Sequence, residues 1–315
     1  MAAKGLKPAL LVTGASGFTG RHACQHFHDL GWAVTAAVRK TPPASLLPGV
    51  KAAECELTDR EQVRQLIDRI RPHYVLHVAG RNAVPDSWRD PAAHMEANVM
   101  APVYLMEAMR EFRPDGRLLL AGSRLGVDPA QGARSVPHPY SLSKSVGSWV
   151  AEAWSALYHL PVMIAEPSNL IGPGESTGFC MLLAKHIARC ELGTMEGKAP
   201  FTISSRGAVR RFLDVRDAVS AYEKLLLSGA PGEVYPVTGE QEWTLGEVAE
   251  RLLCKARGSV PVQWGSETDN APAPPKSETV RSPSLSELGW RPGIEMEKSL
   301  DDILAYARAV TESSR

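Results

Sequence analysis

The sequence has no excess of either charge and no long apolar run. Lys and Arg together number 35, Asp and Glu together number 35, and the formal net charge is zero. A basic surplus is the electrostatic footprint of nucleic-acid binding, so its absence argues against a nucleic-acid partner. No segment approaches the roughly 20 apolar residues that a transmembrane helix needs, so we expect no membrane partner.

Cysteine is scarce and scattered. The five cysteines, at positions 24, 55, 180, 190 and 254, include no Cys-x-x-Cys pair. This spacing favours neither a disulfide framework nor a metal site, and it fits a reducing cytoplasm. With 315 residues, 44% of them hydrophobic and 22% charged, the chain is expected to form one large or two modest globular domains.

Glycine recurs at every third position in the segment GASGFTG, which starts at residue 14. The apolar run 9–12 before it predicts a strand, and the pattern after it predicts a helix. A tight glycine turn lets the backbone approach an anion, and the first N–H groups of the helix point at that anion. A plain turn can carry the same glycines, but these neighbours favour a dinucleotide site. The residues expected to contact the cofactor here are Gly14, Ser16, Gly17, Phe18, Thr19 and Gly20.

Apolar segments alternate with helical patterns over the first half of the chain. The predicted strands cover residues 33–38, 74–79, 118–120 and 162–165, and the predicted helices start at residue 57 or cover 91–112 and 140–158. A loop rich in Pro and Asp is expected before residue 91. The alternation predicts an α/β fold with a Rossmann-type doubly wound parallel sheet. The ligand crevice of such a sheet lies at the carboxyl ends of its strands.

The pattern changes after Pro167, where the chain becomes richer in Gly and less regular. We expect a dinucleotide-binding domain over residues 1–167 plus about 207–239. A smaller α/β substrate-binding domain is expected over about 168–206 plus 240–315. Within it, residues 268–283 are rich in Pro, Ser and charge and predict an extended loop.

Two cations follow the second predicted strand, where an acidic residue would bind the free ribose hydroxyls of NAD. Arg39 and Lys40 stand there, and Arg39 lies 39 − 20 = 19 positions after Gly20. A guanidinium holds a phosphate through paired hydrogen bonds. The pair therefore favours NADP(H) over NAD(H), which stays possible because an ordinary surface Arg-Lys pair has the same appearance.

Tyr140 and Lys144 lie four residues apart on a predicted helix, so they share one face. A nearby cation lowers the pKa of a phenol, which would let Tyr140 exchange a proton near neutral pH. Ser123 follows the predicted strand 118–120, at the sheet edge that also carries the glycine loop. Its hydroxyl there would bind a substrate oxygen, whereas a Tyr-Lys pair or a loop serine alone is often only a surface feature.

Together these segments resemble the extended short-chain dehydrogenase/reductase family. The resemblance covers nearly the whole chain and includes the glycine loop, Ser123, Tyr140 with Lys144, and Asn98. It continues through residues 166–174, 209–217 and 287–290. Glu166 departs from the family pattern, which has an arginine there.

The resemblance implies a catalytic set of Ser123, Tyr140, Lys144 and Asn98. It also implies cofactor contacts at Leu57, Ala79, Pro167, Tyr140 and Lys144, in addition to the glycine loop, Arg39 and Lys40. The implied substrate-binding residues are Ser123, Asn169, Lys185 and Arg210, with Arg210 at the substrate's diphosphate. Lys185 has an almost equal alternative as a solvated helix residue.

Within the family, the chain looks most like the nucleotide-sugar 4-keto reductases, such as the GDP-4-keto-6-deoxy-mannose reductases. The expected function is NADPH-dependent reduction of the 4-keto group of a nucleotide-linked 4-keto-6-deoxy-hexose. The alternatives are a nucleotide-sugar 4-epimerase with tightly bound NAD and a non-catalytic NADP-binding regulator. One fold hosts many functions, so the fold alone does not separate them.

The helix over 140–158 carries a second apolar set, formed by Val146, Trp149, Val150, Ala153, Trp154 and Leu157. In the family the two helices that carry Asn98 and Tyr140 pair across a dimer. We therefore expect a homodimer, unless all of this surface belongs to the internal core.

Overall fold

The computed structural model describes residues 7–40, 48–127, 130, 132–193, 199–203, 205–265 and 284–313. The chain divides into two compact units. Unit one comprises Met1–Pro167, Val219–Val237 and Lys276–Arg291, and unit two comprises Ser168–Ala218, Thr238–Pro275 and Pro292–Arg315. The extended loop predicted over residues 268–283 lies outside the described residues.

Unit one is built on a seven-stranded sheet in the order β10-β6-β5-β4-β1-β2-β3, in which all neighbouring strands are parallel. The order runs outward from β1 in both directions, as in a doubly wound sheet. The predicted fold class is therefore confirmed. The strands are β1 (Ala9–Thr13), β2 (Ala33–Val38), β3 (Lys51–Glu54), β4 (Tyr74–His77), β5 (Arg117–Ala121), β6 (Val162–Pro167) and β10 (Val234–Val237).

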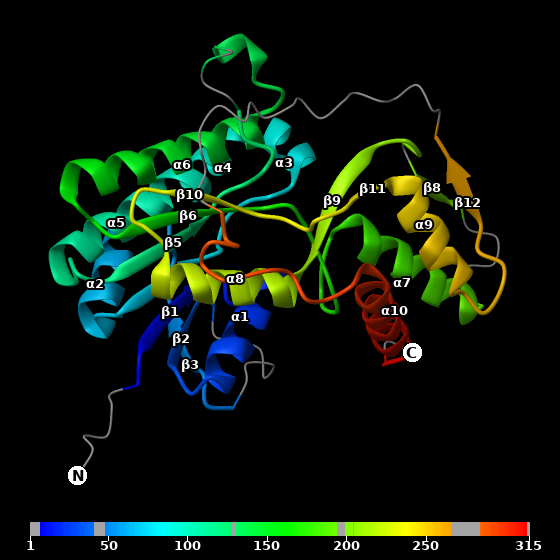
Figure 1. The fold of residues 1–315 in the computed structure, drawn as a ribbon, viewed down its shortest axis with the longest axis horizontal. Helices are drawn as coiled ribbons and strands as arrows, with labels where there is room; N and C mark the ends of the chain where they lie inside the picture. Colours follow the sequence, from blue (N-terminus) through cyan, green and yellow to red (C-terminus); the bar gives the residue numbers. More distant parts are fainter. Residues whose placement is uncertain are drawn as a thin grey trace. The chain divides into compact units, whose positions relative to one another are not determined.

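Helices cover both faces of this sheet (Figure 1). On one face, Leu66, Leu105 and Ala151 from three helices pack against Leu11 and Ile164 of the strands. On the other face, His26 of one helix bonds Glu223 of another at 2.7 Å. The helices of the first face are α2 (Arg60–Ile70), α5 (Ala101–Phe112) and α6 (Pro139–Tyr158), and those of the second are α1 (Phe18–Asp29) and α8 (Val215–Ser228).

Three features of unit one differ from the sequence prediction. The predicted loop before residue 91 contains a short helix, α3 (Val84–Arg89). The predicted helix over 91–112 is helical throughout but consists of α4 (Pro91–Met95), a π-helical turn η1 (Glu96–Met100) and α5. Strand β3 was not predicted because its sequence KAAE lacks an apolar run, and it pairs with β2 at the edge of the sheet.

The described residues of unit two form two small sheets and the helices α7, α9 and α10. Strand β9 (Val209–Asp214) lies between β7 (Asn169–Ile171) and β11 (Glu242–Thr244), and β8 (Phe201–Ile203) pairs with β12 (Val262–Trp264). The core joins Leu183 and Ile187 to Leu252, Ile303 and Leu304. These residues lie on α7 (Phe179–Glu191), α9 (Leu245–Cys254) and α10 (Met296–Ser313).

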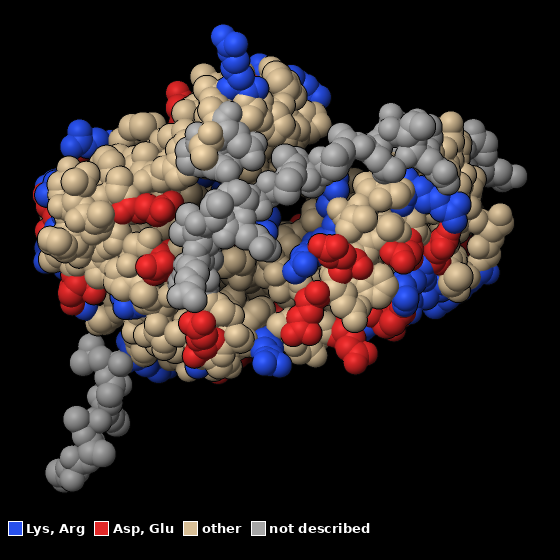
Figure 2. Space-filling model, turned by 45° about the horizontal axis from the view of Figure 1, so that its top comes forward, with Lys and Arg blue, Asp and Glu red and all other residues tan. Residues whose placement is uncertain are grey.

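The charged side chains are mixed in sign over the face drawn in Figure 2, in keeping with the balanced composition. Within the described part of the chain, no helix has the length and apolar character required to cross a bilayer.

Candidate active site

The glycine loop joins β1 to α1 through the predicted strand–turn–helix. Gly14 has φ +67°, a conformation that side chains disfavour, and Gly17 donates its N–H to the Gly14 carbonyl at 2.9 Å. A Cβ on Gly14 would lie 2.7 Å from the backbone nitrogen of Ala79, so the turn rests directly on the end of the neighbouring strand region. Among the residues that the structure describes, no side chain caps the first turn of α1 at Gly17. The uncapped N–H groups and the close-packed turn suit a phosphate group.

Arg39 and Lys40 follow β2 directly and are both exposed. Strands β1 and β2 are parallel, with Thr13 opposite Ala37. The two cations and the glycine loop therefore lie at the same carboxyl edge of the sheet. Leu57, which follows the adjacent strand β3, is partly buried at that end of the sheet.

Tyr140 and Ser123 meet inside unit one. The Tyr140 Oη donates to Ser123 Oγ at 3.2 Å, and both residues are buried. Tyr140 lies in the first turn of α6, whereas Ser123 lies in the loop after β5. The parallel sheet brings these two segments together at the carboxyl edge of its strands.

Lys144 and Asn98 complete the cluster. The Lys144 Nζ donates to the Ala121 carbonyl at 2.8 Å, one turn below Tyr140 on the same helix. Asn98 lies in η1, donates from Nδ2 to the Arg81 carbonyl and to Ser143 Oγ, each at 2.9 Å, and accepts the Arg81 N–H at Oδ1. Its amide is therefore fully engaged, and π-helical turns of this kind recur at functional sites.

Burial is the largest cause of the pKa shifts of Tyr140 and Lys144. Burial raises the pKa of Tyr140, and the Ser123 hydrogen bond only partly opposes it. Burial lowers the pKa of Lys144 to about 8. The expectation that Lys144 lowers the pKa of the phenol is therefore wrong for this structure, because desolvation is the largest cause of the shift and Lys144 is not among its causes.

His77 is a buried neighbour that the sequence analysis missed. It ends β4 opposite Thr13, whose Oγ1 bonds His77 Nδ1 at 2.7 Å. Burial, assisted by the charge of Lys144, lowers the pKa of His77 to about 3, so the ring is neutral. The available signal was an imidazole at the end of an otherwise apolar strand.

The remaining predicted residues lie at the end of unit one or in unit two. Pro167 ends β6 and accepts the Arg124 N–H at 3.4 Å. In unit two, Asn169 Nδ2 donates to the Arg211 carbonyl at 3.0 Å. Lys185 Nζ donates to Glu175 Oε2 at 2.6 Å, and Arg210 Nη1 donates to the neighbouring Val209 carbonyl at 2.8 Å.

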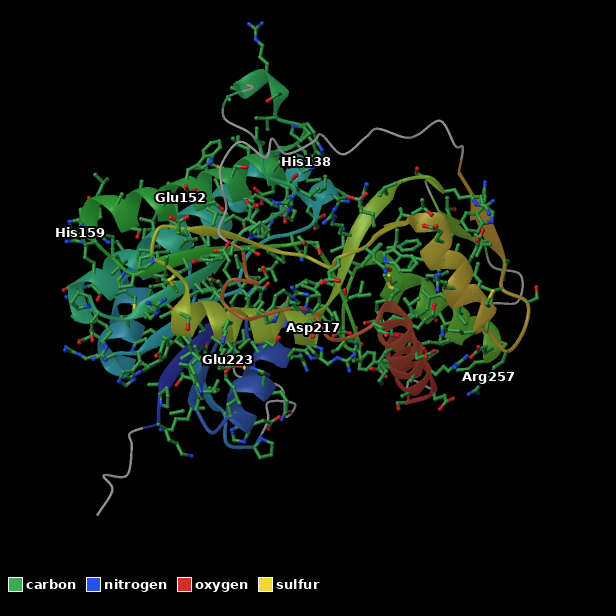
Figure 3. The ribbon with its side chains drawn as sticks, viewed as in Figure 1. His138, Glu152, His159, Asp217, Glu223 and Arg257 are labelled. Atoms are coloured by element: carbon green, nitrogen blue, oxygen red, sulfur yellow. The ribbon has the colours of Figure 1, made fainter. Side chains whose placement is uncertain are left out.

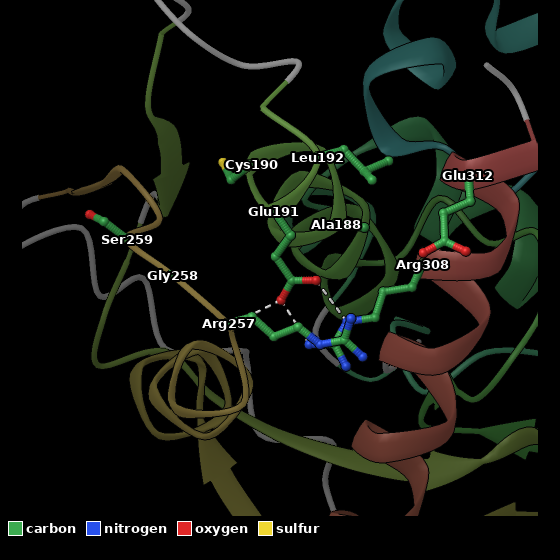
Figure 4. Close-up of a pocket in the computed structure, with 9 residues that line it drawn as sticks. All are labelled: Ala188, Cys190, Glu191, Leu192, Arg257, Gly258, Ser259, Arg308 and Glu312. Carbon is green, nitrogen blue, oxygen red and sulfur yellow. Dashed lines mark hydrogen bonds and ion pairs between the residues drawn. The ribbon is translucent and has the colours of Figure 1, made fainter.

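A separate pocket of about 230 Å³ lies within unit two (Figure 4). Glu191 lines it, and its carboxylate accepts two bonds from Arg308, at 2.7 and 2.8 Å, and the Arg257 N–H at 2.9 Å. The pocket includes none of the predicted site residues. The Glu191 carboxylate in it is already bonded to Arg308 and to the Arg257 N–H. We interpret this pocket as a packing gap where α7, α10 and the segment after α9 meet, and not as a ligand site.

Comparison with known proteins decides the family. The model of the NAD dependent epimerase/dehydratase family matches residues 10–238, which is more than half of the chain. The chain belongs to this family. The match confirms the extended short-chain dehydrogenase/reductase resemblance and the expectation of an NAD(P)-dependent oxidoreductase-type enzyme.

Two curated relatives span almost the full length of this family member. It is 29% identical over 308 residues to GDP-6-deoxy-D-mannose reductase of Pseudomonas aeruginosa, covering 94% of this chain and 96% of the relative. It is 27% identical to dTDP-glucose 4,6-dehydratase of Mycolicibacterium smegmatis, covering 95% of this chain and 93% of the relative.

Solved structures agree. The structure of RMD from Pseudomonas aeruginosa complexed with NADPH is similar at a TM-score of 0.73 and 25% identity, over 96% of this chain and 99% of that one. The UDP-glucose 4-epimerase of Thermus thermophilus in complex with NAD has a TM-score of 0.77 at 24% identity, over 95% and 98% of the two chains. The latter likeness establishes the fold alone.

Proposed function

We propose that the protein reduces the 4-keto group of a nucleotide-linked 4-keto-6-deoxy-hexose, with NADPH as the reductant. The hydrogen bond of 3.2 Å between Tyr140 and Ser123, one helical turn from Lys144, carries this proposal. Two hydroxyl groups that converge in a buried site suit a carbonyl oxygen. The likeness to GDP-6-deoxy-D-mannose reductase supports the choice of substrate class.

The cofactor fits the carboxyl edge of the unit-one sheet. The turn of Gly14 and Gly17 with the uncapped start of α1 would hold the pyrophosphate, and Arg39 with Lys40 would hold the 2′-phosphate. A Cβ on Gly20 would overlap the Gly14 carbonyl, so the glycines keep this cradle close to the backbone. When bound, NADPH supplies the hydride.

The side chains of the chain do the acid–base work. Ser123 and Tyr140 bind the ketone oxygen, and Tyr140 gives its proton to that oxygen as the ketone becomes an alcohol. The raised pKa of Tyr140 keeps the phenol protonated at neutral pH, which is the form that reduction requires. Lys144 and Asn98 hold the end of β5, α6 and the segment at Arg81 around this pair.

Asn169, Lys185 and Arg210 are proposed to bind the nucleotide sugar, with Arg210 at its diphosphate. Lys185 must exchange its contact with Glu175 for the substrate, because that carboxylate binds its ammonium at 2.6 Å. Arg210 Nη1 instead donates to the neutral carbonyl of the neighbouring Val209. A bidentate guanidinium suits a diphosphate.

The deciding experiment offers the purified protein NADPH or NADH with a panel of nucleotide 4-keto-6-deoxy sugars and follows oxidation of the coenzyme. Stoichiometric oxidation of NADPH together with a reduced sugar supports the proposal. An epimerase would instead carry bound NAD through purification and convert a nucleotide hexose without net coenzyme consumption. A regulator would bind NADP without turnover of any sugar.

We also propose a homodimer through α6 and η1–α5. Leu142 and Trp149 on α6 are exposed, and Val146 and Ala153 are partly buried. These four residues follow one another at helical spacing, so they lie on one face of α6. This set forms one apolar stripe, and the exposed Met100 continues the apolar surface onto the adjoining helix. Two such layers in a four-helix contact would bury these side chains.

A further inference from the structure

The catalytic helix α6 begins with a histidine cap. His138 precedes Pro139, and its Nδ1 accepts the Ser141 N–H at 3.0 Å. The centroid of its ring lies 5.9 Å from the ring centroid of Tyr140, two residues along the chain. His138 is half-buried at one end of α6, and His159 stands at the other end (Figure 3). Caps of this kind satisfy N–H groups that the helix cannot pair itself.

The capped turn is bonded to the reacting pair. Ser141, whose N–H the cap binds, donates its hydroxyl to the Leu125 carbonyl. Leu125 in turn donates its N–H to Ser123 Oγ at 3.1 Å, the atom that accepts the Tyr140 hydroxyl. A closed set of contacts therefore runs from His138 through Ser141 and Leu125 to Ser123 and Tyr140.

The cap depends on the protonation of His138. Nδ1 accepts a hydrogen bond only while it carries no proton, and a protonated ring would place a positive charge at the positive end of the helix. Burial lowers the pKa of His138 below its ordinary value of 6.5. The cap is therefore complete at neutral pH and is lost as the pH falls through that lowered pKa.

Several charged groups on the elements around α6 form ion pairs with one another. The loop after β5 offers Arg124, which pairs with Glu166 of β6 at 3.8 Å. On α3, Asp86 pairs with Arg89 at 3.3 Å. The other titratable groups on the 3-10 turn (Ala133–Ser135), α4, η1 and α5 are Arg134, Asp90 with Arg81, His94 with the Asp90 carbonyl, Glu96, Tyr104, Glu107 with Arg110, and Glu111 with Arg64. Among the described residues, burial and the ring's own backbone are the causes that shift the pKa of His138.

We propose that the unprotonated imidazole of His138 is a positioning group that holds the first turn of α6, and with it Tyr140 against Ser123. Protonation of His138 releases that turn and disables the pair. The effect on turnover rests on the proposed function, whereas the effect on the helix cap does not.

The first test measures the cap without any substrate. Protein labelled with ¹⁵N-serine and ¹³C-histidine is titrated from about pH 8 to about pH 5, and NMR follows the Ser141 amide and the His138 ring. In the wild type the two are expected to titrate together at a pKa below 6.5. His138→Asn keeps a capping side chain that does not titrate, so its Ser141 amide should not respond. A wild-type Ser141 amide that ignores the His138 titration would overturn the proposal.

The matched control is His159→Asn, at the C-terminal end of the same helix. His159 has φ +53°, which Asn tolerates, and it lies away from the site. This variant should keep the wild-type response of the Ser141 amide. If the Ser141 amide of His138→Asn still responded to pH as in the wild type, the titration would belong to another group and the proposed role of His138 would be wrong.

The second test is the pH profile of kcat with NADPH and a substrate from the panel. The wild type and His159→Asn should lose about tenfold for each pH unit below the pKa of His138, and His138→Asn should lose this acid limb while keeping its neutral kcat. An unchanged acid limb in His138→Asn would exclude the positioning role. Absence of turnover with every sugar would count against the proposed function alone, because the NMR arm stands independently.

Discussion

Burial determines the direction of the pKa shifts of Tyr140, Lys144 and His77 in this site. The phenol of Tyr140 is 7% exposed and Lys144 is partly buried, so desolvation raises the pKa of Tyr140 and lowers the pKa of Lys144. A protonated phenol beside a hydroxyl is a proton donor, which fits reduction of a ketone. Burial also keeps His77 neutral, with its Nδ1 bonded to Thr13 Oγ1 and the charge of Lys144 lowering its pKa further.

Removing the hydroxyl of Tyr140 should remove the proton donor and leave the packing. Tyr140→Phe is expected to lower kcat by roughly 10²–10⁴-fold while binding of NADPH changes little. Stopped-flow or steady-state oxidation of NADPH with the best substrate of the panel gives the ratio. Near-wild-type turnover would refute the assigned role of the phenol.

The free energy of unfolding should depend on pH through Lys144. Its folded pKa of about 8 lies below the ordinary 10.5, so the unfolded chain binds more protons between these values. The free energy of unfolding of the wild type should therefore rise with pH across that window, relative to Lys144→Met. Urea unfolding across the window measures the difference.

Lys51→Met is the control, since Lys51 is an exposed lysine on β3. This variant should follow the wild type in parallel at every pH. Identical slopes for Lys144→Met and the wild type would contradict the burial of the charge.

At the scale of elements, the close approach of α6 to η1 shapes the site. A Cβ on Gly147 of α6 would overlap the Asn98 carbonyl, so only glycine permits this distance. The π-helical turn at residues 96–100 presents Asn98 to Arg81 and Ser143. The helical pattern over 91–112 predicted a helix here but not this turn, although Pro102, which has no N–H to donate to the Asn98 carbonyl, was a local signal for it.

Gly147→Val should force the two helices apart. Overpacking of this kind costs about 1–3 kcal/mol of stability, and the displaced Asn98 should also lower activity. Chemical denaturation and the turnover assay measure the two effects. Gly258→Val is the control, because a Cβ there meets no atom within 4 Å, and it should be close to neutral in both measurements. Equal stability of the two variants would contradict the tight contact.

For the whole molecule, α6 carries a stripe of apolar side chains that unit one leaves exposed. Leu142 is 37% exposed and Trp149 is 36% exposed, whereas Ala151 on the opposite side of the helix is fully buried in the core. Exposed apolar surface arranged in one row is typical of an interface between subunits.

Trp149→Glu should convert the proposed dimer to a monomer, since it places a charge in the middle of the stripe. Light scattering on a size-exclusion column measures the mass. Leu227→Glu is the matched control, because Leu227 is an exposed residue of α8 on the other layer of unit one and should leave the dimer intact. A wild-type protein that is monomeric at all accessible concentrations would remove the proposal.

The sequence by itself determined the glycine turn after β1, the alternation of strands and helices, and the pairing of Tyr140 with Lys144. Each of these is a property of one continuous segment, where spacing alone places residues on a shared face or turn. Only the tertiary structure decided that Tyr140 bonds Ser123, that His138 caps the helix through Ser141, and that burial sets the pKa values of Tyr140 and Lys144. These depend on which distant segments exclude water from a group, and local spacing carries no information about that.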